Sequence, residues 1–384
     1  MSLPALPYAA HVTMPQAQTR GGTVFHVAQH LARAHQRLGG RAVVVTPGAM
    51  PVEGVEQLAI DYGTVRWSSQ GERRRDILHG SVLRERPVFA GVYDPAIERL
   101  MDDPPDQVLL YEGHFACASL PHWDRLRRRG TEIVHYVHNP LPRSCPPWEL
   151  RRLLRHADRV VFVSEATRDA TMRRLGPRHG VATEVIHNGL AEEFRAPAPR
   201  PARPTGDPVV TFFGKVHLTK GPHLAVQAAD LARTETGLPV RVRVIGDSSY
   251  GHGGRTPYET WLREQAETIA TPVEFVPFQD REDLARHLAE SAVVCLPSLA
   301  ETFGLVAAEA MAAGVPVVCS DIAALREVGG GAVVHVPRED LAAMGGAIAD
   351  LLEDPARWAA ASAAGWHRAQ AFTWEGTARA LARV

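Results

Sequence analysis

Two lysines mark the stretch of sequence with the clearest capacity for chemistry. The chain has 42 Lys and Arg residues, of which only Lys215 and Lys220 are lysines. Both lie within Gly214–Gly221, which reads GKVHLTKG. Because the rest of the chain uses arginine for every fixed cation, these two lysines indicate a place where a compact point charge is needed. A phosphate oxygen approached end-on is such a place.

The elements expected around this stretch agree with that interpretation. The apolar run Val209–Phe213 comes directly before it and is typical of a strand, and a helical pattern from Leu224 to Leu231 follows. A strand end, a loop with two cations and a helix start together form a plausible anion site. The alternative is a pair of solvated surface lysines, and this stretch alone leaves both readings open.

A second motif, ETFGLVAAE, runs from Glu301 to Glu309 and follows the expected strand end Leu296-Pro297-Ser298. We expect Thr302-Phe303-Gly304 to open a helix that runs to Ala313. The first backbone N–H groups of a helix have no partner within it and attract phosphate. Glu301, just outside that start, could accept two hydrogen bonds from sugar hydroxyls. The alternative is an ordinary helix whose dipole favours a glutamate near its N-terminus.

Composition limits the classes of protein that fit. A chain of 384 residues is long for one core, so two domains are expected. The net charge of −1 gives no basic field for nucleic acid. No apolar run approaches the roughly 20 residues that span a bilayer, and the N-terminus lacks a signal-peptide pattern, so we expect a cytoplasmic protein without a strong membrane signal. The cysteines show no metal spacing, and Cys295 and Cys319 are expected to be buried.

Short apolar runs alternate with helical patterns along the chain, which predicts parallel sheets covered by helices on both faces. A Pro-rich break divides the pattern. We therefore expect an α/β protein of two doubly wound Rossmann-like domains that face each other across a cleft. The predicted boundaries are 1–195 together with a C-terminal helix at about 366–384, a linker at 196–208, and a second domain at 209–365. Ligands bind such sheets at the carboxyl ends of the strands.

The order of GKVHLTKG and then ETFGLVAAEAMAAGVPVV resembles the retaining glycosyltransferases of family 4, glycosyl transferases group 1, which have the GT-B fold. This family includes sucrose- and mannosyl-transferases and bacterial N-acetylglucosaminyltransferases. The resemblance covers nearly the whole chain and is sharpest from Gly214 to Gly314. The family's first loop normally reads Gly-Arg-x-x-x-x-Lys-Gly, so Lys215 stands at the arginine position. That change weakens bidentate phosphate binding but keeps the charge.

The resemblance implies a role for each matching residue in binding a nucleotide-sugar donor. Lys215 and Lys220 would hold the diphosphate, and Glu301 would hold the transferred sugar. The other implied donor contacts are the backbone N–H groups of Phe303, Gly304 and Leu305, the carboxylate of Glu309 on the ribose, and Phe278 beside the nucleobase.

The first domain carries weaker matches. Gly21-Gly22 resembles the family's glycine pair, which lets the chain approach the donor phosphate, although a lone Gly-Gly is also a common turn. His138 ends a strand where the family has a histidine that contacts the donor sugar, although a histidine at a strand end is often structural. Glu112 and His114 end another strand and could line an acceptor pocket or serve in packing.

The resemblance implies sugar transfer from a nucleotide diphosphate sugar to an acceptor hydroxyl, with retention of configuration. No metal or other cofactor is expected, because GT-B enzymes generally need none and the sequence has no Asp-x-Asp. Our first expectation is N-acetylglucosamine or glucose from UDP and a small polar acceptor, such as an aminocyclitol in antibiotic biosynthesis. Two alternatives stay open: a pseudo-glycosyltransferase that couples cyclitols, and a non-catalytic protein that binds nucleotide sugars. A glycan phosphorylase also has two such domains, but it needs a lysine that binds pyridoxal phosphate. Both lysines of this chain are already assigned to the diphosphate, which argues against a phosphorylase.

Overall fold

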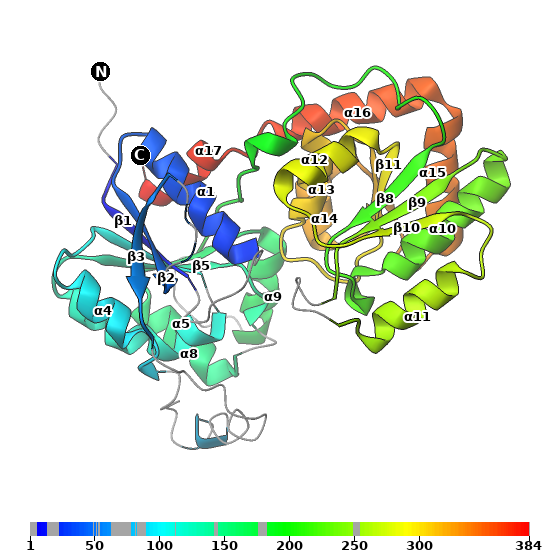
Figure 1. The fold of residues 1–384 in the computed structure, drawn as a ribbon. Helices are drawn as coiled ribbons and strands as arrows, with labels where there is room; N and C mark the ends of the chain where they lie inside the picture. Colours follow the sequence, from blue (N-terminus) through cyan, green and yellow to red (C-terminus); the bar gives the residue numbers. More distant parts are fainter. Residues whose placement is uncertain are drawn as a thin grey trace. The chain divides into compact units, whose positions relative to one another are not determined.

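The computed structural model describes residues 6–13, 23–48, 50, 52, 54–62, 78–80, 82, 90–111, 113–141, 145–175, 183–248 and 254–383, without the side chains of residues 23 and 113–115. The chain forms two compact units (Figure 1). The first comprises Met1–Gly189 and Trp374–Val384, and the second comprises Leu190–Thr373. The chain therefore passes from one unit to the other twice, at 189–190 and at 373–374.

The first unit is built on a parallel seven-stranded sheet with the order β3-β2-β1-β4-β5-β6-β7. Apolar residues run without interruption through its inner strands because helices cover both faces. In β2, Val43 and Val45 join the core on one face, and Ala42 and Val44 join that on the other. The strands are β1 (Ala9–Val12), β2 (Ala42–Pro47), β3 (Glu56–Ile60), β4 (Gln107–Leu110), β5 (Glu132–Val137), β6 (Arg159–Phe162) and β7 (Thr183–Val185).

Helices connect these strands and close the two cores of the first unit. The larger core is filled by apolar side chains of the helices between β3 and β7, with Trp123 fully buried. On the other face α1 packs beside the C-terminal helix α17 (Figure 1). The helices are α1 (Thr23–Arg37), α4 (Asp94–Leu100), α5 (Gly113–Ser119), α6 (Asp124–Arg127), α8 (Pro147–His156), α9 (Glu165–Leu175) and α17 (Trp374–Ala382), with a 3-10 turn η1 (Leu120–Trp123).

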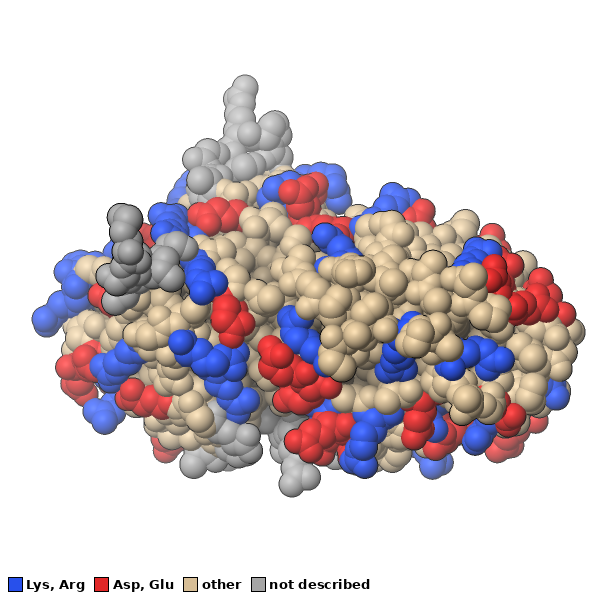
Figure 2. Space-filling view, turned by 90° about the horizontal axis from the view of Figure 1, so that it is seen from above, with Lys and Arg blue, Asp and Glu red and all other residues tan. Residues whose placement is uncertain are grey.

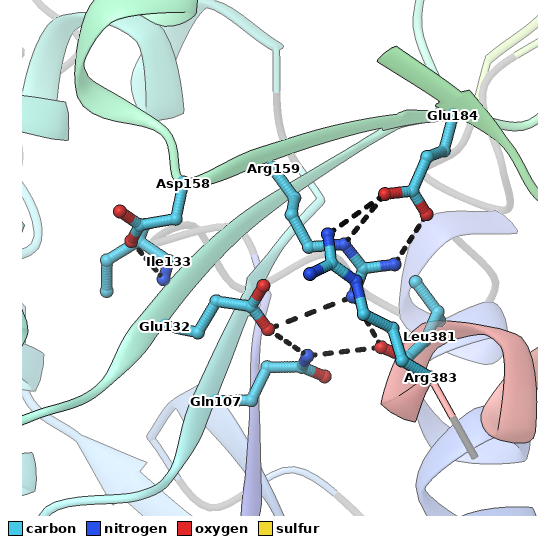
Figure 3. A network of polar contacts seen from close by, with 8 residues as sticks. All are labelled: Gln107, Glu132, Ile133, Asp158, Arg159, Glu184, Leu381 and Arg383. Atoms are coloured by element: carbon cyan, nitrogen blue, oxygen red, sulfur yellow. Dashed lines mark hydrogen bonds and ion pairs between the residues drawn. The ribbon is translucent and has the colours of Figure 1, made fainter. Parts of the chain in front are cut away.

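A polar network ties α17 to the first sheet (Figure 3). Arg159, the first residue of β6, is only 3% exposed. It donates to the carbonyl of Leu381 at 2.6 Å and to the carboxylate of Glu184 at 2.6 Å. Gln107, the first residue of β4, donates to the same carbonyl at 3.2 Å. The last carbonyls of a helix carry partial negative charge, so a buried guanidinium stabilises this helix end on the sheet.

The second unit repeats the same design around a parallel six-stranded sheet of order β10-β9-β8-β11-β12-β13. Its strands are β8 (Val209–Phe213), β9 (Arg241–Ile245), β10 (Val273–Val276), β11 (Val293–Leu296), β12 (Val317–Ser320) and β13 (Val334–Val336). Its helices are α10 (Pro222–Thr236), α11 (Pro257–Ala266), α12 (Arg281–Glu290), α13 (Leu305–Ala312), α14 (Ala323–Gly329), α15 (Leu341–Glu353) and α16 (Pro355–Ala369), with 3-10 turns η2 (Glu192–Phe194), η3 (Leu218–Lys220) and η4 (Gly330–Ala332). Figure 1 shows α10 beside α15, where they pack on one face.

In both sheets the first strand of the unit is the third in the strand order, and the chain then adds strands outwards on both of its sides. This is the doubly wound arrangement that the sequence predicts. Cys295 and Cys319 lie in β11 and β12 and are buried, as predicted. Burial raises the pKa of the Cys319 thiol to about 12, so this thiol stays protonated at neutral pH.

The Pro-rich segment 196–208 differs from its predicted role as a linker, because it lies entirely within the second unit. Its backbone is bound there at several points: Ala196 donates to the carbonyl of Ala312 at 2.9 Å, and Arg200 donates to the hydroxyl of Ser362 at 3.0 Å. Proline lacks an N–H group and cannot join the sheet, but a proline-rich segment can lie along helices. The crossings are instead two short connections, at 189–190 and 373–374, so residues 190–195 and 366–373 also belong to the second unit.

The described surface carries charges of both signs. Figure 2 shows Lys and Arg side chains interspersed with Asp and Glu side chains over the face that it draws. This agrees with the net charge of −1. None of the helices in the described ranges is long and apolar enough to cross a membrane.

Candidate functional site

The two motifs that the sequence singles out lie side by side in the second unit. The first follows β8 and the second follows β11, and these strands are neighbours in the sheet. The backbone N–H of Leu299 donates to the carbonyl of Thr219 at 2.9 Å, which joins the two loops directly. Gly221 has a φ of +70°, and a Cβ there would lie 2.5 Å from the carbonyl oxygen of Pro297. Only glycine allows this approach without displacing a backbone.

This contact brings together Lys220, which is predicted to bind the diphosphate of the donor, and Glu301, which is predicted to bind the transferred sugar. Lys220 Nζ lies 2.6 Å from Glu301 Oε1, and the two side chains are 30% and 16% exposed. Ser298 donates its hydroxyl to the same carboxylate oxygen at 2.9 Å. Glu301 is therefore oriented by the Lys220 cation and the Ser298 hydroxyl, and part of the Lys220 and Glu301 side chains still faces solvent. Lys215, in the loop after β8, is partly exposed.

Helix α13 begins beside this pair. Gly304 is its N-cap with a φ of +101°, and the first helical residue is Leu305. The sequence predicts that Thr302-Phe303-Gly304 opens the helix, but the helix starts about one turn later. The reason is Gly304, whose left-handed backbone cannot form part of a right-handed helix. Phe303 is buried and packs edge-on against Phe372 at 5.6 Å. The first N–H groups of α13 lack partners within the helix, which suits an anion.

Glu309 lies one turn inside α13 and carries the most perturbed carboxyl of the described site. Burial raises its pKa to about 7; the guanidinium of Arg281 opposes this shift and the carboxylate of Glu193 adds to it. The neighbouring charges come from the first residue of α12 and from η2, and η2 packs against both α12 and α13 in the second unit. At neutral pH the carboxyl is therefore divided between its two protonation states.

Phe278 lies in the loop after β10, three residues before Arg281, and is 39% exposed. An aromatic ring of this size that stays exposed at the carboxyl edge of a sheet is available for stacking with a planar group. The loop after β10 lies at the same edge of the sheet as the loops that carry Lys220 and Glu301, because all three follow parallel strands.

In the first unit, His138 follows the carboxyl end of β5 and is 7% exposed. Burial, with a smaller effect from His135, lowers its pKa to about 3, so its imidazole is neutral at pH 7. Its Nε2 is buried and has no hydrogen-bond partner within the described structure. A neutral imidazole donates one hydrogen bond from its protonated nitrogen and accepts one at the other.

Four of the predicted site residues have no described side chain. Gly21, Gly22 and Glu112 lie outside the described residues, and the side chain of His114 is not described. In the part of the chain that is described, no group of three or more His, Cys, Asp or Glu side chains is arranged to hold a metal ion.

The structure adds two residues to the site, Ser298 and Arg281, for which the sequence predicts no role. Ser298 appeared only as a strand end, and its contact with Glu301 depends on the turn between them. Arg281 is one of 40 arginines in the sequence, 42 cations less two lysines, and nothing local distinguishes it. Its position at the start of α12, close to Glu309, comes from packing between distant segments.

The two sheets and their strand order define the GT-B fold. The two halves of the chain match two glycosyltransferase families: residues 20–194 match Glycosyltransferase Family 4, and residues 195–366 match Glycosyl transferases group 1. Together these matches support a glycosyltransferase with the GT-B fold, and they meet close to the point where the second unit begins.

The chain is similar to several curated proteins over part of their length. It is 37% identical over 182 residues to a D-inositol 3-phosphate glycosyltransferase of Rhodococcus erythropolis, covering 46% of this chain and 40% of that protein. It is 29% identical over 297 residues to that of Rhodococcus opacus, covering 71% and 66%. A glycogen synthase of Mycobacterium tuberculosis is 31% identical over 239 residues, covering 60% and 55%. The matches thus span 40% to 66% of these relatives' own lengths.

Solved structures resemble the whole chain. Sucrose-phosphate synthase from Thermosynechococcus elongatus has a TM-score of 0.72 at 21% identity, covering 98% of this chain and 97% of that chain. Anabaena HepE, solved in complex with UDP and glucose, has a TM-score of 0.73 at 20% identity and covers 98% of both chains. At these identities the likeness is one of fold.

Proposed function

We propose that this protein transfers a sugar from a nucleotide diphosphate sugar to a hydroxyl group of a small polar acceptor. The observation that carries the proposal is the Lys220–Glu301 pair at 2.6 Å, built from two adjacent loops beside the start of α13. A cation and a helix N-terminus suit a diphosphate, and a carboxylate suits sugar hydroxyls. A donor that carries both groups matches this arrangement.

In the proposed reaction the bond between the anomeric carbon and the diphosphate oxygen breaks, and a bond from the acceptor oxygen to that carbon forms. Lys215, Lys220 and the N-terminus of α13 stabilise the negative charge that grows on the leaving diphosphate. The departing phosphate oxygen takes the acceptor's proton on the same face, which retains the anomeric configuration. No side chain has to act as a strong base. This agrees with the low pKa of His138, which leaves it as a neutral hydrogen-bonding group for the sugar.

We propose two further donor contacts. Glu309 accepts hydrogen bonds from the ribose in its ionised form, and Phe278 borders the nucleobase. We propose UDP as the nucleotide, with glucose or N-acetylglucosamine as the sugar. HepE, which shares the fold, was solved with UDP and glucose.

For the acceptor we propose a cyclitol, such as an aminocyclitol. Two of the relatives described above are named for an inositol phosphate, which is a cyclitol, and this supports the class of acceptor. Antibiotic biosynthesis and a cytoplasmic location remain predictions from the sequence.

The experiment is a donor screen with the purified protein. UDP-, GDP-, ADP- and dTDP-sugars are each incubated with and without inositol, inositol 3-phosphate and an aminocyclitol, and release of nucleoside diphosphate is measured. We expect release with one nucleotide family that increases when the right acceptor is present. Tight binding of a nucleotide sugar without release under any condition would instead identify a binding protein. A parallel incubation replaces the nucleotide sugar with a nucleotide-linked cyclitol, and coupling of that cyclitol to a second cyclitol would identify a pseudo-glycosyltransferase.

A further inference from the structure

The ring of His138 is enclosed by two tyrosine rings. The ring of Tyr136 meets it edge-on, with centroids 4.4 Å apart and planes at 72°. The ring of Tyr111 lies on another side at 5.4 Å and 35°. Both tyrosines are fully buried, and burial raises the pKa of each hydroxyl, so both stay protonated. The imidazole thus depends on these two rings for its orientation.

Each tyrosine is in turn fixed through its hydroxyl. The hydroxyl of Tyr111 lies 2.6 Å from His11 Nδ1, inside the sheet. The hydroxyl of Tyr136 reaches the carbonyl of Ile186 at 2.8 Å and Asn188 Oδ1 at 3.1 Å. The first contact is internal to the core, and the second is made to the last residues of the first unit before the chain leaves it at Gly189.

That segment, Ile186–Gly189, is held on its other sides as well. Thr377 of α17 donates to the carbonyl of His187 at 2.8 Å. Gly189 lies so close to Trp374 that a Cβ there would be 2.3 Å from the backbone nitrogen of Trp374. Trp374 is the first residue after the chain returns to the first unit. The departing and the returning segments are therefore packed together, and Tyr136 connects this junction to His138.

We propose that Tyr136 is a positioning residue, which holds the ring of His138 in register with the segment Ile186–Gly189 through its hydroxyl. This inference rests on the proposed function, in which His138 contacts the sugar of the donor. Without the hydroxyl, the ring of residue 136 keeps its apolar packing but loses its attachment to Ile186 and Asn188. His138 then gains freedom to turn away from the position in which it serves the sugar, and a small misplacement of such a group lowers the rate of reaction.

The test is a double-mutant cycle of Tyr136→Phe and His138→Ala. The matched control is Tyr62→Phe, because the Tyr62 hydroxyl is also buried in the first unit and has no hydrogen-bond partner in the described structure. Four quantities are measured: kcat, KM for the donor, the Kd of free UDP, and Tm. Free UDP lacks the transferred sugar, so its Kd should respond to neither substitution and shows that the second unit is intact.

We expect Tyr136→Phe to lower kcat about 3- to 10-fold, the size of one net hydrogen bond. Its KM for the donor and the Kd of UDP should change less than twofold, and Tyr62→Phe should match the unsubstituted protein. In the His138→Ala background, Tyr136→Phe should lower kcat by less than about twofold, because its effect passes through a ring that is absent. Asn188→Ala should show the same pattern.

Two results would overturn the inference. An unchanged kcat in Tyr136→Phe removes the positioning role. An equal loss of kcat in both backgrounds, accompanied by a lower Tm, makes Tyr136 a structural residue only. A full rate in His138→Ala, by contrast, counts against the proposed role of His138 itself, and absence of turnover with every donor counts against the proposed function.

Discussion

At the scale of single residues, the protonation state of Glu309 is the property most open to test. Its pKa of about 7 means that the carboxylate needed for the ribose is only partly formed at pH 6 and largely formed at pH 8. A nucleotide sugar carries no titrating proton in this range, so any dependence on pH comes from the protein. We expect UDP-glucose to bind roughly 10-fold more tightly at pH 8 than at pH 6, as follows from the ionised fractions.

Isothermal titration calorimetry at the two pH values checks this prediction. In Glu309→Gln the residue cannot ionise, so the affinity should become weak and independent of pH. Equal affinity of the original chain at pH 6 and pH 8 would contradict the assignment. The same raised pKa affects stability with the opposite sign: ionising the carboxyl between its ordinary value of 4.5 and about 7 costs free energy in the folded state, so stability falls as pH rises through this range.

At the scale of elements, the junction of the loops after β8 and β11 depends on Gly221. A side chain at this position would meet the carbonyl oxygen of Pro297 at 2.5 Å in a backbone conformation with φ +70°. Gly221→Ala should therefore separate the two loops and move Lys220 away from Glu301. We expect donor affinity to fall at least 10-fold, together with a loss of stability.

The matched control is Gly237→Ala at the end of α10. Gly237 has a φ of +66°, but a Cβ there has nothing within 4 Å. The substitution of Gly237 by alanine causes no clash, and it lowers the free energy of unfolding only by the cost of a left-handed backbone at alanine, about 1–2 kcal/mol. Calorimetry and thermal unfolding should show Gly237→Ala less stable with unchanged donor affinity. Equal affinity of Gly221→Ala and the original chain would mean that the loop junction does not shape the site.

The anchoring of α17 makes a second prediction at this scale. Arg159→Met removes a buried guanidinium that binds Leu381 and Glu184, and we expect a loss of about 1–3 kcal/mol at pH 7. The hydrogen bond from Arg159 is the largest cause of the lowered pKa of Glu184. The ionised Glu184 therefore stabilises the folded state above pH 4.5, and this contribution is lost as the pH falls below that value. The deficit of the variant should accordingly shrink in acid.

Urea unfolding at pH 7 and pH 4 measures this difference. The control is Arg383→Ala, since Arg383 pairs with the same Glu184 at 3.1 Å but is 58% exposed. An exposed pair contributes less than about 1 kcal/mol. If the two variants lose the same stability, the buried network does not anchor α17.

At the scale of the whole molecule, the sequence predicts the two sheets and the donor-binding motifs, but it does not predict the contacts between segments that lie far apart in the chain. The alternation of apolar runs and helical patterns predicts both sheets, because parallel strands buried on two faces need continuous apolar residues. Lys220 and Glu301 were predictable as separate motifs, and the structure adds their contact and the part of Ser298. The contacts of Arg281 and Tyr136 join segments far apart in the sequence, and no local pattern reports such packing.

The boundary between the units shows where composition misleads. A Pro-rich stretch with few large apolar residues is typical of a linker, yet 196–208 lies along the second unit. The true crossing at 189–190 is marked only by Gly189, whose lack of a side chain permits contact with Trp374. A glycine that follows asparagine is a common turn, so its role in the approach of two distant segments appears only in the structure.

The most direct test of the central claim uses the scarcity of lysine. Because Lys215 and Lys220 are the only lysines, a protein labelled with ¹³C-lysine gives two side-chain signals, and both report on the proposed diphosphate site. UDP-glucose and UDP should shift both signals, whereas uridine, which has no phosphate, should leave them in place; Lys220→Ala assigns the pair. Lysine signals that stay unchanged while the protein binds UDP would place the diphosphate elsewhere and contradict the account.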